Sequence, residues 1–127
     1  MNTKLILVLS AVFVLTISAE RCSGGSKDPV RYKGKLEVKG ICMNYTLSLL
    51  EGKIDTTLIN ASWTDEMTGK TYKQAFGLGN PCQFPDTIKE GDEFYFYIDS
   101  SKQENCAVCM AYYPTPSRKL SVKVVPK

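Results

Sequence analysis

The 127-residue sequence contains no histidine. Histidine is the commonest general base in enzymes and a frequent zinc ligand, so its absence argues against most hydrolase mechanisms and against histidine-containing zinc sites. Three carboxylates, Glu90, Asp92 and Glu93, crowd around one turn, which is typical of a solvated charged loop. We therefore expect no catalytic residues, no enzyme activity, no metal and no cofactor.

Strong charge of one sign is also missing, because 16 basic residues stand against 13 acidic ones. Nucleic-acid-binding proteins usually carry a far more basic surface, so we expect no nucleic-acid partner. The sequence has no second apolar run of about 20 residues, the length that a membrane helix needs. Membrane insertion is therefore not expected.

The sequence does contain a leader-like segment at its beginning. Lys4 provides a positive charge, an almost unbroken apolar run extends from Leu5 to Ile17, and Ala19 is the small residue that a signal peptidase needs. We predict that residues 1–19 are a signal peptide and that the protein is secreted to the extracellular space. Residues 20–29 read as a flexible lead-in, and residues 30–127 as one domain.

Cysteine usage fits an oxidising compartment. An odd number of cysteines predicts two disulfides and one unpaired thiol, in fifteen possible arrangements that the sequence does not distinguish. The five candidates are Cys22, Cys42, Cys82, Cys106 and Cys109. Cys106 and Cys109 have the spacing of a redox motif, but a strand-like run ending at Pro114 follows them where that motif needs a helix. We predict that both are structural, on opposite faces of one strand, and that each bridges elsewhere.

Two sequons support the same compartment. Asn44-Tyr45-Thr46 and Asn60-Ala61-Ser62 fit the N-glycosylation pattern, which is used only in the secretory pathway. The strand patterns below place Asn44 and Asn60 on outward faces, as a glycan requires.

Regular structure is expected to begin after Pro29. Tyr32, Gly34, Leu36 and Val38 alternate with polar residues, which predicts a strand with one buried face. After Gly40 the apolar residues move to odd positions; they are Ile41, Met43, Tyr45, Leu47 and Leu49. We predict one long strand with a β-bulge at Gly40 and Ile41.

The remaining pattern predicts further short strands. A second strand has Ile59, Ala61 and Trp63 pointing inward, with a short helix over 49–58 as the alternative; a hairpin loop over 65–70 leads to a third strand over 71–76. Residues 77–85 contain glycines and prolines and are expected to form a surface loop held through Cys82. Further strands are expected over 94–98, 106–113 and 120–125. About six strands without a long helix predict an all-β fold with at most minor helix, a small antiparallel, disulfide-stabilised β-barrel.

Two surface features could serve binding. Tyr95, Tyr97, Tyr112 and Tyr113 could form an exposed aromatic patch suited to protein recognition, with packing in the core as the alternative. Basic residues on the first strand and near the C-terminus would form a strip for weak polyanion binding if those strands pair, although strand solubility is the simpler interpretation. These residues are Lys33, Lys35, Lys39, Arg118, Lys119, Lys123 and Lys127.

The order of these features resembles the netrin-like domain, a small barrel of the OB-fold type found in the N-terminal half of tissue inhibitors of metalloproteinases. The resemblance rests on Cys22 just past the leader, a long bulged first strand, Cys82 in a loop after the third strand, and the stretch 92–98 followed shortly by Cys106. It covers most of the mature chain in outline. The chain is also similar to small netrin-like excretory-secretory proteins of parasitic nematodes, which are single domains.

The resemblance implies a role for the N-terminus. In the inhibitors an N-terminal cysteine chelates the protease zinc through its α-amino and carbonyl groups, and Cys22 followed by Ser23 is the equivalent position here. Cleavage after Ala19 would leave Glu20 and Arg21 ahead of Cys22, and the Cys-x-Cys start of the inhibitors is absent.

Our leading hypothesis from sequence is a secreted, non-catalytic module that binds an extracellular protein, with a host protein as one candidate. The alternatives are metalloproteinase inhibition through Cys22 and carriage of a small apolar ligand inside the barrel. Both faces of the strand over 94–98 are apolar or aromatic, so both a monomer and a dimer remain open.

Overall fold

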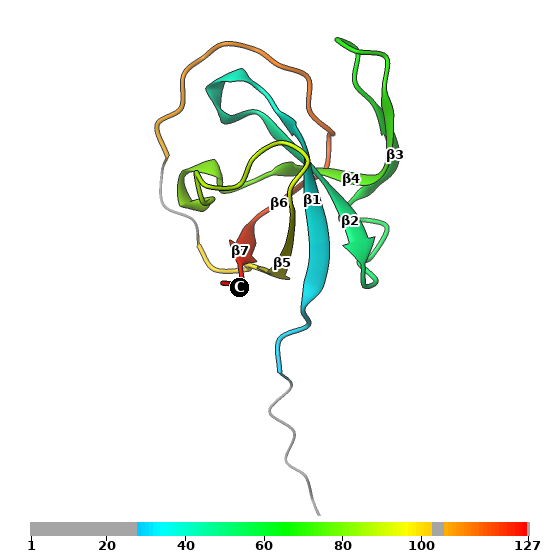
Figure 1. The fold of residues 1–127 in the computed structure, drawn as a ribbon, viewed down its shortest axis with the longest axis vertical. Coiled ribbons are helices and arrows are strands. Elements are labelled where there is room, and N and C mark those ends of the chain that lie inside the picture. Colours follow the sequence, from blue (N-terminus) through cyan, green and yellow to red (C-terminus); the bar gives the residue numbers. More distant parts are fainter. Residues whose placement is uncertain (1–27, 103–105, 127) are drawn as a thin grey trace, which may run out of the picture.

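The computed structural model describes residues 28–102 and 106–126. In this part the chain forms a mostly antiparallel β-structure with almost no helix, as the sequence predicted (Figure 1). The predicted signal peptide, Cys22 and Ser23 lie outside the described residues. None of the helices in 28–102 and 106–126 is long and apolar enough to span a membrane.

The first strand, β1 (Tyr32–Lys39), confirms the predicted alternation. Gly34, Leu36 and Val38 are buried, whereas the intervening side chains reach solvent in part. Leu36 is fully buried and belongs to the core cluster. Burial of one face by apolar residues is the pattern that a half-solvated strand requires.

The predicted bulge at Gly40 and Ile41 is wrong. The short 3-10 turn η2 (Ile41–Met43) reverses the chain there, and β2 (Tyr45–Glu51) runs back antiparallel to β1, with Lys39 opposite Tyr45. Cys42 and Met43 have positive φ angles of 55° and 59°, the left-handed conformation that makes the reversal. The reversal therefore accounts for the change of phase in the apolar pattern. It also leaves Ile41 and Met43 exposed, although both were expected to point inward.

The next hairpin was largely predicted. Strands β3 (Asn60–Thr64) and β4 (Thr71–Leu78) pair antiparallel with Thr64 opposite Thr71, and residues 65–70 form the loop between them. The alternative helix over 49–58 does not form. Ala61 is exposed rather than inward, because β3 is the last strand of the sheet and extends beyond the core.

The predicted surface loop over 77–85 is wrong at its start. Gly77 and Leu78 form the buried end of β4 instead. Gly77 pairs with Thr46 of β2 on one side and with Lys119 on the other. A Cβ atom at Gly77 would lie 3.1 Å from Cγ of Lys119 and 3.4 Å from the Pro116 carbonyl oxygen. The glycine thus permits close approach of the C-terminal chain, which a sequence pattern does not reveal.

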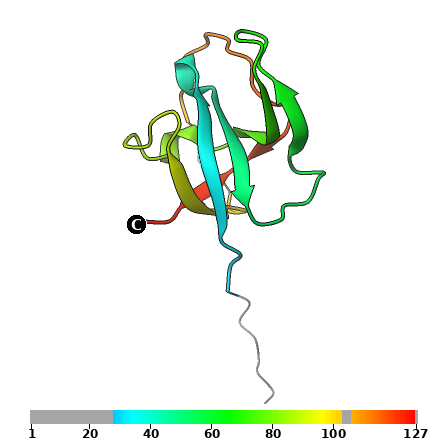
Figure 2. The ribbon, with the colours of Figure 1, turned by 45° about the vertical axis from the view of Figure 1, so that its right-hand side comes forward.

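The C-terminal strands flank the rest of the sheet. Strand β5 (Glu93–Ile98) pairs with β1 and with β7 (Val122–Val124), while β6 (Lys119–Leu120) runs parallel to the end of β4. The continuous order is β3-β4-β2-β1-β5-β7, and the strands wrap around a common interior (Figure 2). Because this order is open, the closed barrel stays a prediction.

The interior is filled by large apolar side chains. Leu36, Leu47, Phe76 and Phe96 are completely buried, and the Phe76 and Phe96 rings lie 6.0 Å apart between centroids. Burying such a side chain stabilises the fold by roughly 1.5–3 kcal/mol each. These four residues come from β1, β2, β4 and β5, so the core joins the strands that form the middle of the sheet.

The predicted strand over 106–113 is wrong. Residues 106–118, which we call the C-terminal strap, contain no strand and pass around the end of the molecule that carries η2 (Figure 1). Disulfides and side-chain hydrogen bonds hold the strap in place of a backbone ladder. Cys106 bonds to Cys82 within the short turn η3 (Pro81–Gln83), and Cys109 bonds to Cys42.

These two disulfides confirm that Cys106 and Cys109 each bridge elsewhere, although the strap is not a strand with two faces. They also confirm that Cys82 fixes its loop. Together they select one pairing of the four described cysteines from the arrangements that the sequence left open. Cys22 lies outside the described residues.

Candidate functional site

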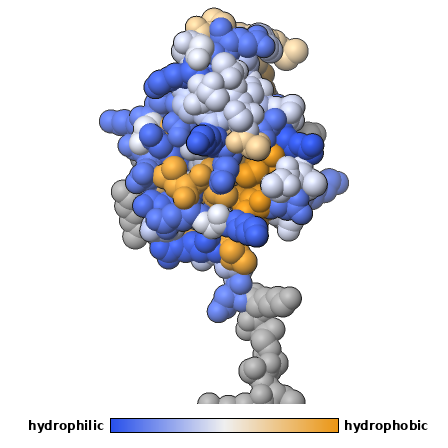
Figure 3. All heavy atoms as spheres, turned by 90° about the vertical axis from the view of Figure 1, so that its right-hand side faces the viewer, coloured by the Kyte–Doolittle hydropathy of each residue, from blue (hydrophilic) through white to orange (hydrophobic). Residues whose placement is uncertain are grey.

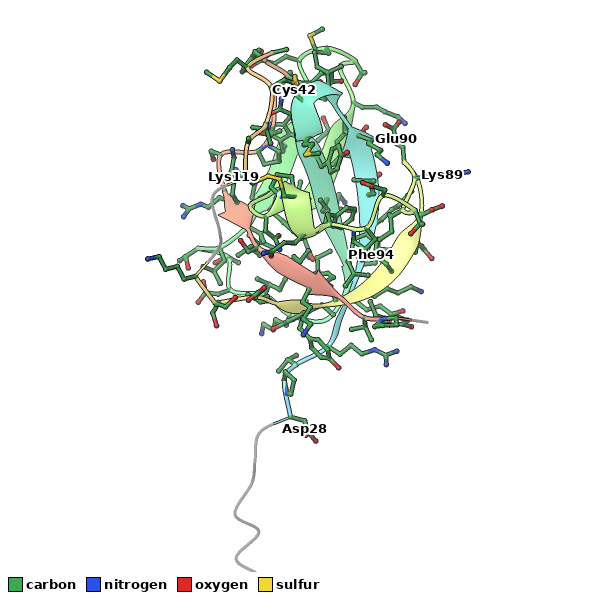
Figure 4. The ribbon with its side chains drawn as sticks, turned by 90° about the vertical axis from the view of Figure 1, so that its left-hand side faces the viewer. Asp28, Cys42, Lys89, Glu90, Phe94 and Lys119 are labelled. Atoms are coloured by element: carbon green, nitrogen blue, oxygen red, sulfur yellow. A yellow bond between two sulfur atoms is a disulfide. The ribbon has the colours of Figure 1, made fainter. Side chains whose placement is uncertain are left out.

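Two uncharged stretches of sequence meet at one end of the molecule. Residues 40–50 and 106–117 contain no Asp, Glu, Lys or Arg. The Cys42–Cys109 disulfide joins them, with 5.0 Å between the two Cα atoms. Figure 4 shows Cys42 at the end of the molecule opposite Asp28.

The residues around this disulfide expose apolar side chains. We call this group the apolar tip; its members are Ile41, Met43, Val108, Met110 and Tyr112. Met110 is 96% exposed and Tyr112 is 80% exposed, which is far more than ordinary packing leaves to such residues. Four of the five flank the two half-cystines and Tyr112 follows three residues after Cys109, so all five lie within three residues of this disulfide along the chain.

The turn below the apolar tip is fixed by Asn44. Its Nδ2 donates to the carbonyl oxygen of Ile41 over 2.9 Å and to that of Ala111 over 3.1 Å. The backbone adds two bonds, from Gly40 N to Asn44 O and from Asn44 N to Ile41 O, each 3.2 Å. Asn44 therefore joins the η2 turn to the strap beside the disulfide.

Tyr113 holds the strap next to the apolar tip. Its ring packs on Gly40, where a Cβ atom would lie only 2.9 Å from the ring Cγ. Its hydroxyl donates to Oδ2 of Asp65 over 3.1 Å. Burial raises the pKa of Tyr113, and the hydrogen bond to Asp65 and the charge of that carboxylate raise it further. Tyr113 is thus a structural residue and contributes little contact surface.

Asn60, the asparagine of the second sequon, binds the far end of the strap. Its Oδ1 accepts from the backbone N–H of Arg118 over 3.1 Å, and its Nδ2 donates to Oγ of Ser117 over 3.3 Å. The Arg118 guanidinium also donates to the Thr57 carbonyl oxygen. Both sequon asparagines are half-buried and bind the strap, so neither side chain is simply displayed to solvent as the strand pattern suggested.

The four predicted tyrosines do not form one patch. Tyr95 lies opposite Lys33 near the start of β1, whereas Tyr113 packs on Gly40 beyond its end, about 23 Å away along a strand. Tyr97 pairs with Lys123 of β7. The structure therefore separates Tyr95 and Tyr97 from Tyr112 and Tyr113.

Tyr95 lines a broad open groove of about 1190 Å³ between the start of β1, the loop over 85–92, the start of β5 and the end of β7 with the residues after it. The Arg31 guanidinium carbon lies 3.9 Å above the ring centroid, within cation–π distance. The Lys33 Nζ atom lies 3.6 Å from a carboxylate oxygen of Glu51 and of Glu93, and these charges, Glu93 first, raise the pKa of Lys33. The groove thus mixes apolar walls with paired charges.

The basic strip that would follow from pairing of the first and last strands does not form. Strand β5 separates β1 from β7. Lys33 is paired with two glutamates, and Lys35 lies 3.8 Å from Glu37. Carboxylates therefore interrupt the positive charge along β1.

The carboxylates around the turn over 90–93 have structural partners. Glu90 accepts from the backbone N–H of Lys39 over 2.9 Å, and Asp92 accepts from that of Lys89, also over 2.9 Å. Within the described ranges, no group of three or more cysteine or acidic side chains is arranged to hold a metal ion. The Glu90 bond therefore attaches this turn to the end of β1, and the Asp92 bond closes the turn itself.

Sequence reasoning identified Tyr112 but missed the rest of the apolar tip. Ile41 and Met43 were assigned to an inward face, and Val108 and Met110 to a strand. The signal that could have identified them is the absence of charge on both sides of Cys42 and Cys109. Cys22 and Ser23, the positions implied by the netrin-like resemblance, lie outside the described residues.

Comparison with known proteins identifies no relative that shares this site. The netrin-like resemblance therefore stays a prediction from sequence, and the site must be interpreted from its own chemistry. That chemistry is an apolar, uncharged surface on a disulfide-linked turn and strap. No protein-family model, no curated protein and no solved structure matches the chain.

Proposed function

We propose that this chain is a secreted, non-catalytic protein that binds an extracellular protein through its apolar tip. The observation that carries the proposal is the group of five exposed apolar side chains around the Cys42–Cys109 disulfide. Single exposed apolar residues are common on any surface. Five of them close to one disulfide, in two segments without a charged residue, are more typical of an interaction site.

The composition of the apolar tip matches the centre of a protein interface. Such centres are poor in charged residues and rich in methionine and aromatic side chains. Met43 and Met110 can adapt to a partner's contour, and Tyr112 offers a large ring with few rotatable bonds. An uncharged apolar patch on the partner is the complementary surface.

The tip is also held in place before any partner binds. The Cys42–Cys109 disulfide, the two bonds from Asn44 and the Tyr113–Asp65 bond all restrict its backbone. Restricting a loop in advance lowers the conformational entropy that is lost on binding. This arrangement supports a recognition role for the tip.

The extracellular setting of the proposal is supported by two disulfides within one small domain. Such bridges are typical of proteins that fold in an oxidising compartment. The apolar run over residues 5–17 and the two sequons are consistent with the same route.

The proposal can be tested by comparing two variants for saturable binding to proteins of extracellular fluid. In the first, Met110→Asp and Tyr112→Asp place two charges on the tip. In the control, Val30→Asp changes an exposed apolar residue on the segment leading into β1. We expect the tip variant to lose a partner that wild type and the Val30→Asp control both bind with the same Kd. Equal binding by all three proteins, or no saturable partner for wild type, would contradict the proposal.

The two alternatives from sequence, metalloproteinase inhibition and carriage of an apolar ligand, have no comparable support among the described residues. Metalloproteinase inhibition depends on Cys22 and Ser23, which lie outside the described residues. Ligand carriage needs space among the strands, whereas Phe76 and Phe96 fill the described interior. No contact of the described residues therefore favours either alternative.

A further inference from the structure

The two sequon asparagines differ in how many amide hydrogens the fold uses. Asn44 Nδ2 donates to two carbonyl oxygens, of Ile41 over 2.9 Å and of Ala111 over 3.1 Å. Asn60 Nδ2 donates once, to Ser117 Oγ over 3.3 Å, while its Oδ1 accepts from Arg118 N. A side-chain amide has two N–H hydrogens. Asn44 therefore donates both in hydrogen bonds within the fold, whereas Asn60 donates one.

N-glycosylation removes one of these hydrogens. The amide Nδ2 forms a bond to C1 of the first sugar of a lipid-diphosphate-linked oligosaccharide, and the bond from C1 to the phosphate oxygen breaks. The lipid diphosphate leaves with the electron pair, and one amide proton passes to solvent. The product is a secondary amide with one N–H, so a glycosylated asparagine can donate only one hydrogen bond.

We propose that Asn60 carries an N-linked glycan in the secreted protein and that Asn44 stays unmodified. The inference rests on the secretory route of the proposed function. A glycan on Asn60 leaves one N–H for Ser117 and the carbonyl oxygen for Arg118, so both bonds persist. A glycan on Asn44 breaks the bond to Ile41 or the bond to Ala111.

The place of Asn44 adds a second reason. Its two acceptors lie in η2 and in the strap, on either side of the Cys42–Cys109 disulfide. Loss of one bond loosens the turn or the strap next to the apolar tip. Because the sugar is transferred before folding is complete, chains modified at Asn44 fold less well and are depleted from the secreted protein.

Asn60 lies at the edge of the sheet, where a glycan can shield an exposed strand. Strand β3 ends the sheet order and pairs only with β4 among the described strands (Figure 1). Charged residues and proline usually protect an edge strand from pairing with another chain. Residues 60–64 contain neither. Figure 3 shows hydrophobic side chains gathered on this side of the molecule. Leu50 near the end of β2 and Leu58 just before β3 are each 42% exposed. A glycan on the first residue of β3 shields this unprotected edge.

The hydroxyl residues of the two sequons offer a matched pair of variants. Thr46 is fully buried and its Oγ1 has no hydrogen-bond partner among the described residues, so Thr46→Val removes the first sequon without breaking a bond. Ser62 is exposed, so Ser62→Ala removes the second sequon with little effect on folding. Neither variant alters Asn44, Asn60 or a residue of the apolar tip.

The test is secretion of the full chain from cultured animal cells, followed by peptide N-glycosidase treatment and mass spectrometry of wild type and both variants. The enzyme converts a glycosylated asparagine to aspartate, which locates the site. We expect one glycan on wild type, at Asn60, one on Thr46→Val and none on Ser62→Ala. In cell lysates, we expect chains modified at Asn44 to be enriched relative to the medium.

A glycan on Asn44 in the secreted, folded protein would overturn the inference, and so would a secreted protein without any glycan. These outcomes leave the proposed function standing, because the protein still reaches the medium. A full-length chain that stays in the cytoplasm with residues 1–19 attached would overturn both proposals. The site measurement and the fractionation therefore separate the two failures.

Discussion

The hydroxyl of Tyr113 donates a hydrogen bond to the carboxylate of Asp65 over 3.1 Å, linking two residues 48 positions apart. Asp65 is fully buried at the start of the β3–β4 loop, where its Oδ1 accepts from Met67 N over 2.8 Å. One carboxylate thus closes the hairpin loop and holds the strap against it. The bond gives an irregular segment a defined position that no backbone ladder provides.

This bond predicts a loss of stability in alkali. Burial and the bond to Asp65 hold the pKa of Tyr113 above its ordinary value of 10.0. A tyrosine with a raised folded-state pKa ionises more easily when unfolded, so its contribution is complete below pH 10 and is lost as pH rises through the folded-state pKa. We expect the free energy of unfolding, measured by denaturant titration, to fall above pH 10.

Tyr113→Phe provides the control for that measurement, because Tyr72 and Lys33 also have raised pKa values and titrate in the same range. The variant should be less stable at neutral pH and should lose less stability between neutral and alkaline pH than wild type. Tyr112→Phe, at an exposed neighbour, should follow wild type throughout. Parallel pH profiles for wild type and Tyr113→Phe would contradict the assignment.

The two disulfides are nested and differ in the length of chain that they close. Cys42–Cys109 spans 67 residues and Cys82–Cys106 spans 24. By the chain-entropy argument, removing the longer bridge costs about 4 kcal/mol and removing the shorter one roughly 3 kcal/mol. We expect Cys42→Ala with Cys109→Ala to lower the denaturant midpoint more than Cys82→Ala with Cys106→Ala.

Binding provides a second readout for the same pair of variants. The longer bridge holds the apolar tip, whereas the shorter one closes on η3. Loss of Cys42–Cys109 should therefore weaken partner binding even under conditions where the variant is fully folded. Equal affinity for both double variants would show that the tip is not the binding surface.

The regular strands were predictable because their patterns are local. Leu36 and Val38 alternate with charged residues, and this alternation alone fixes which face of β1 is buried. The η2 reversal was not predictable in the same way. It uses Cys42 and Met43 at positive φ, which these residues rarely adopt, and the Cys42–Cys109 bridge that accompanies it joins residues 67 positions apart.

The strap shows the same limit. Its apolar residues predicted a strand, yet it is held by Cys106, Cys109 and Tyr113 through partners on distant parts of the chain. The apolar tip depends on both of these long-range arrangements. Tyr112 was identified from its residue type alone, and Met110 became visible only once the strap was placed beside η2.

Asn80 provides another long-range contact with a measurable cost. Its side chain pairs with both backbone groups of Val122, donating to the carbonyl over 2.8 Å and accepting from the N–H over 2.9 Å. Asn80 and Val122 are both buried, so Asn80→Ala leaves two polar groups without partners. At about 1–2 kcal/mol for each group, we expect a loss of roughly 2–4 kcal/mol.

Thermal and denaturant unfolding of Asn80→Ala would measure that loss. Gln83→Ala is the control, because Gln83 is exposed and makes only the weaker 3.3 Å bond to the same amide. It should stay within about 0.5 kcal/mol of wild type. Similar values for both variants would mean that the two hydrogen bonds between Asn80 and Val122 do not contribute to stability as proposed.

Gln74 offers a route to higher stability, because it lies within β4 with a positive φ of 48°. Glycine adopts this conformation freely, whereas other residues lose about 1–2 kcal/mol there. Glycine also costs about 0.5–1 kcal/mol in unfolded-chain entropy, so Gln74→Gly should stabilise the protein by on the order of 0.5–1 kcal/mol net.

The neighbouring exposed residue Lys73 has no positive φ, so Lys73→Gly incurs the entropy cost without any relief. We expect that control to destabilise the fold by about 0.5–1 kcal/mol, opposite in sign to Gln74→Gly. Denaturant midpoints measured at equal m-values compare the two directly. Destabilisation by both glycines would show that the backbone at Gln74 is not strained, since only relief of an unfavourable φ can give opposite signs at adjacent positions of one strand.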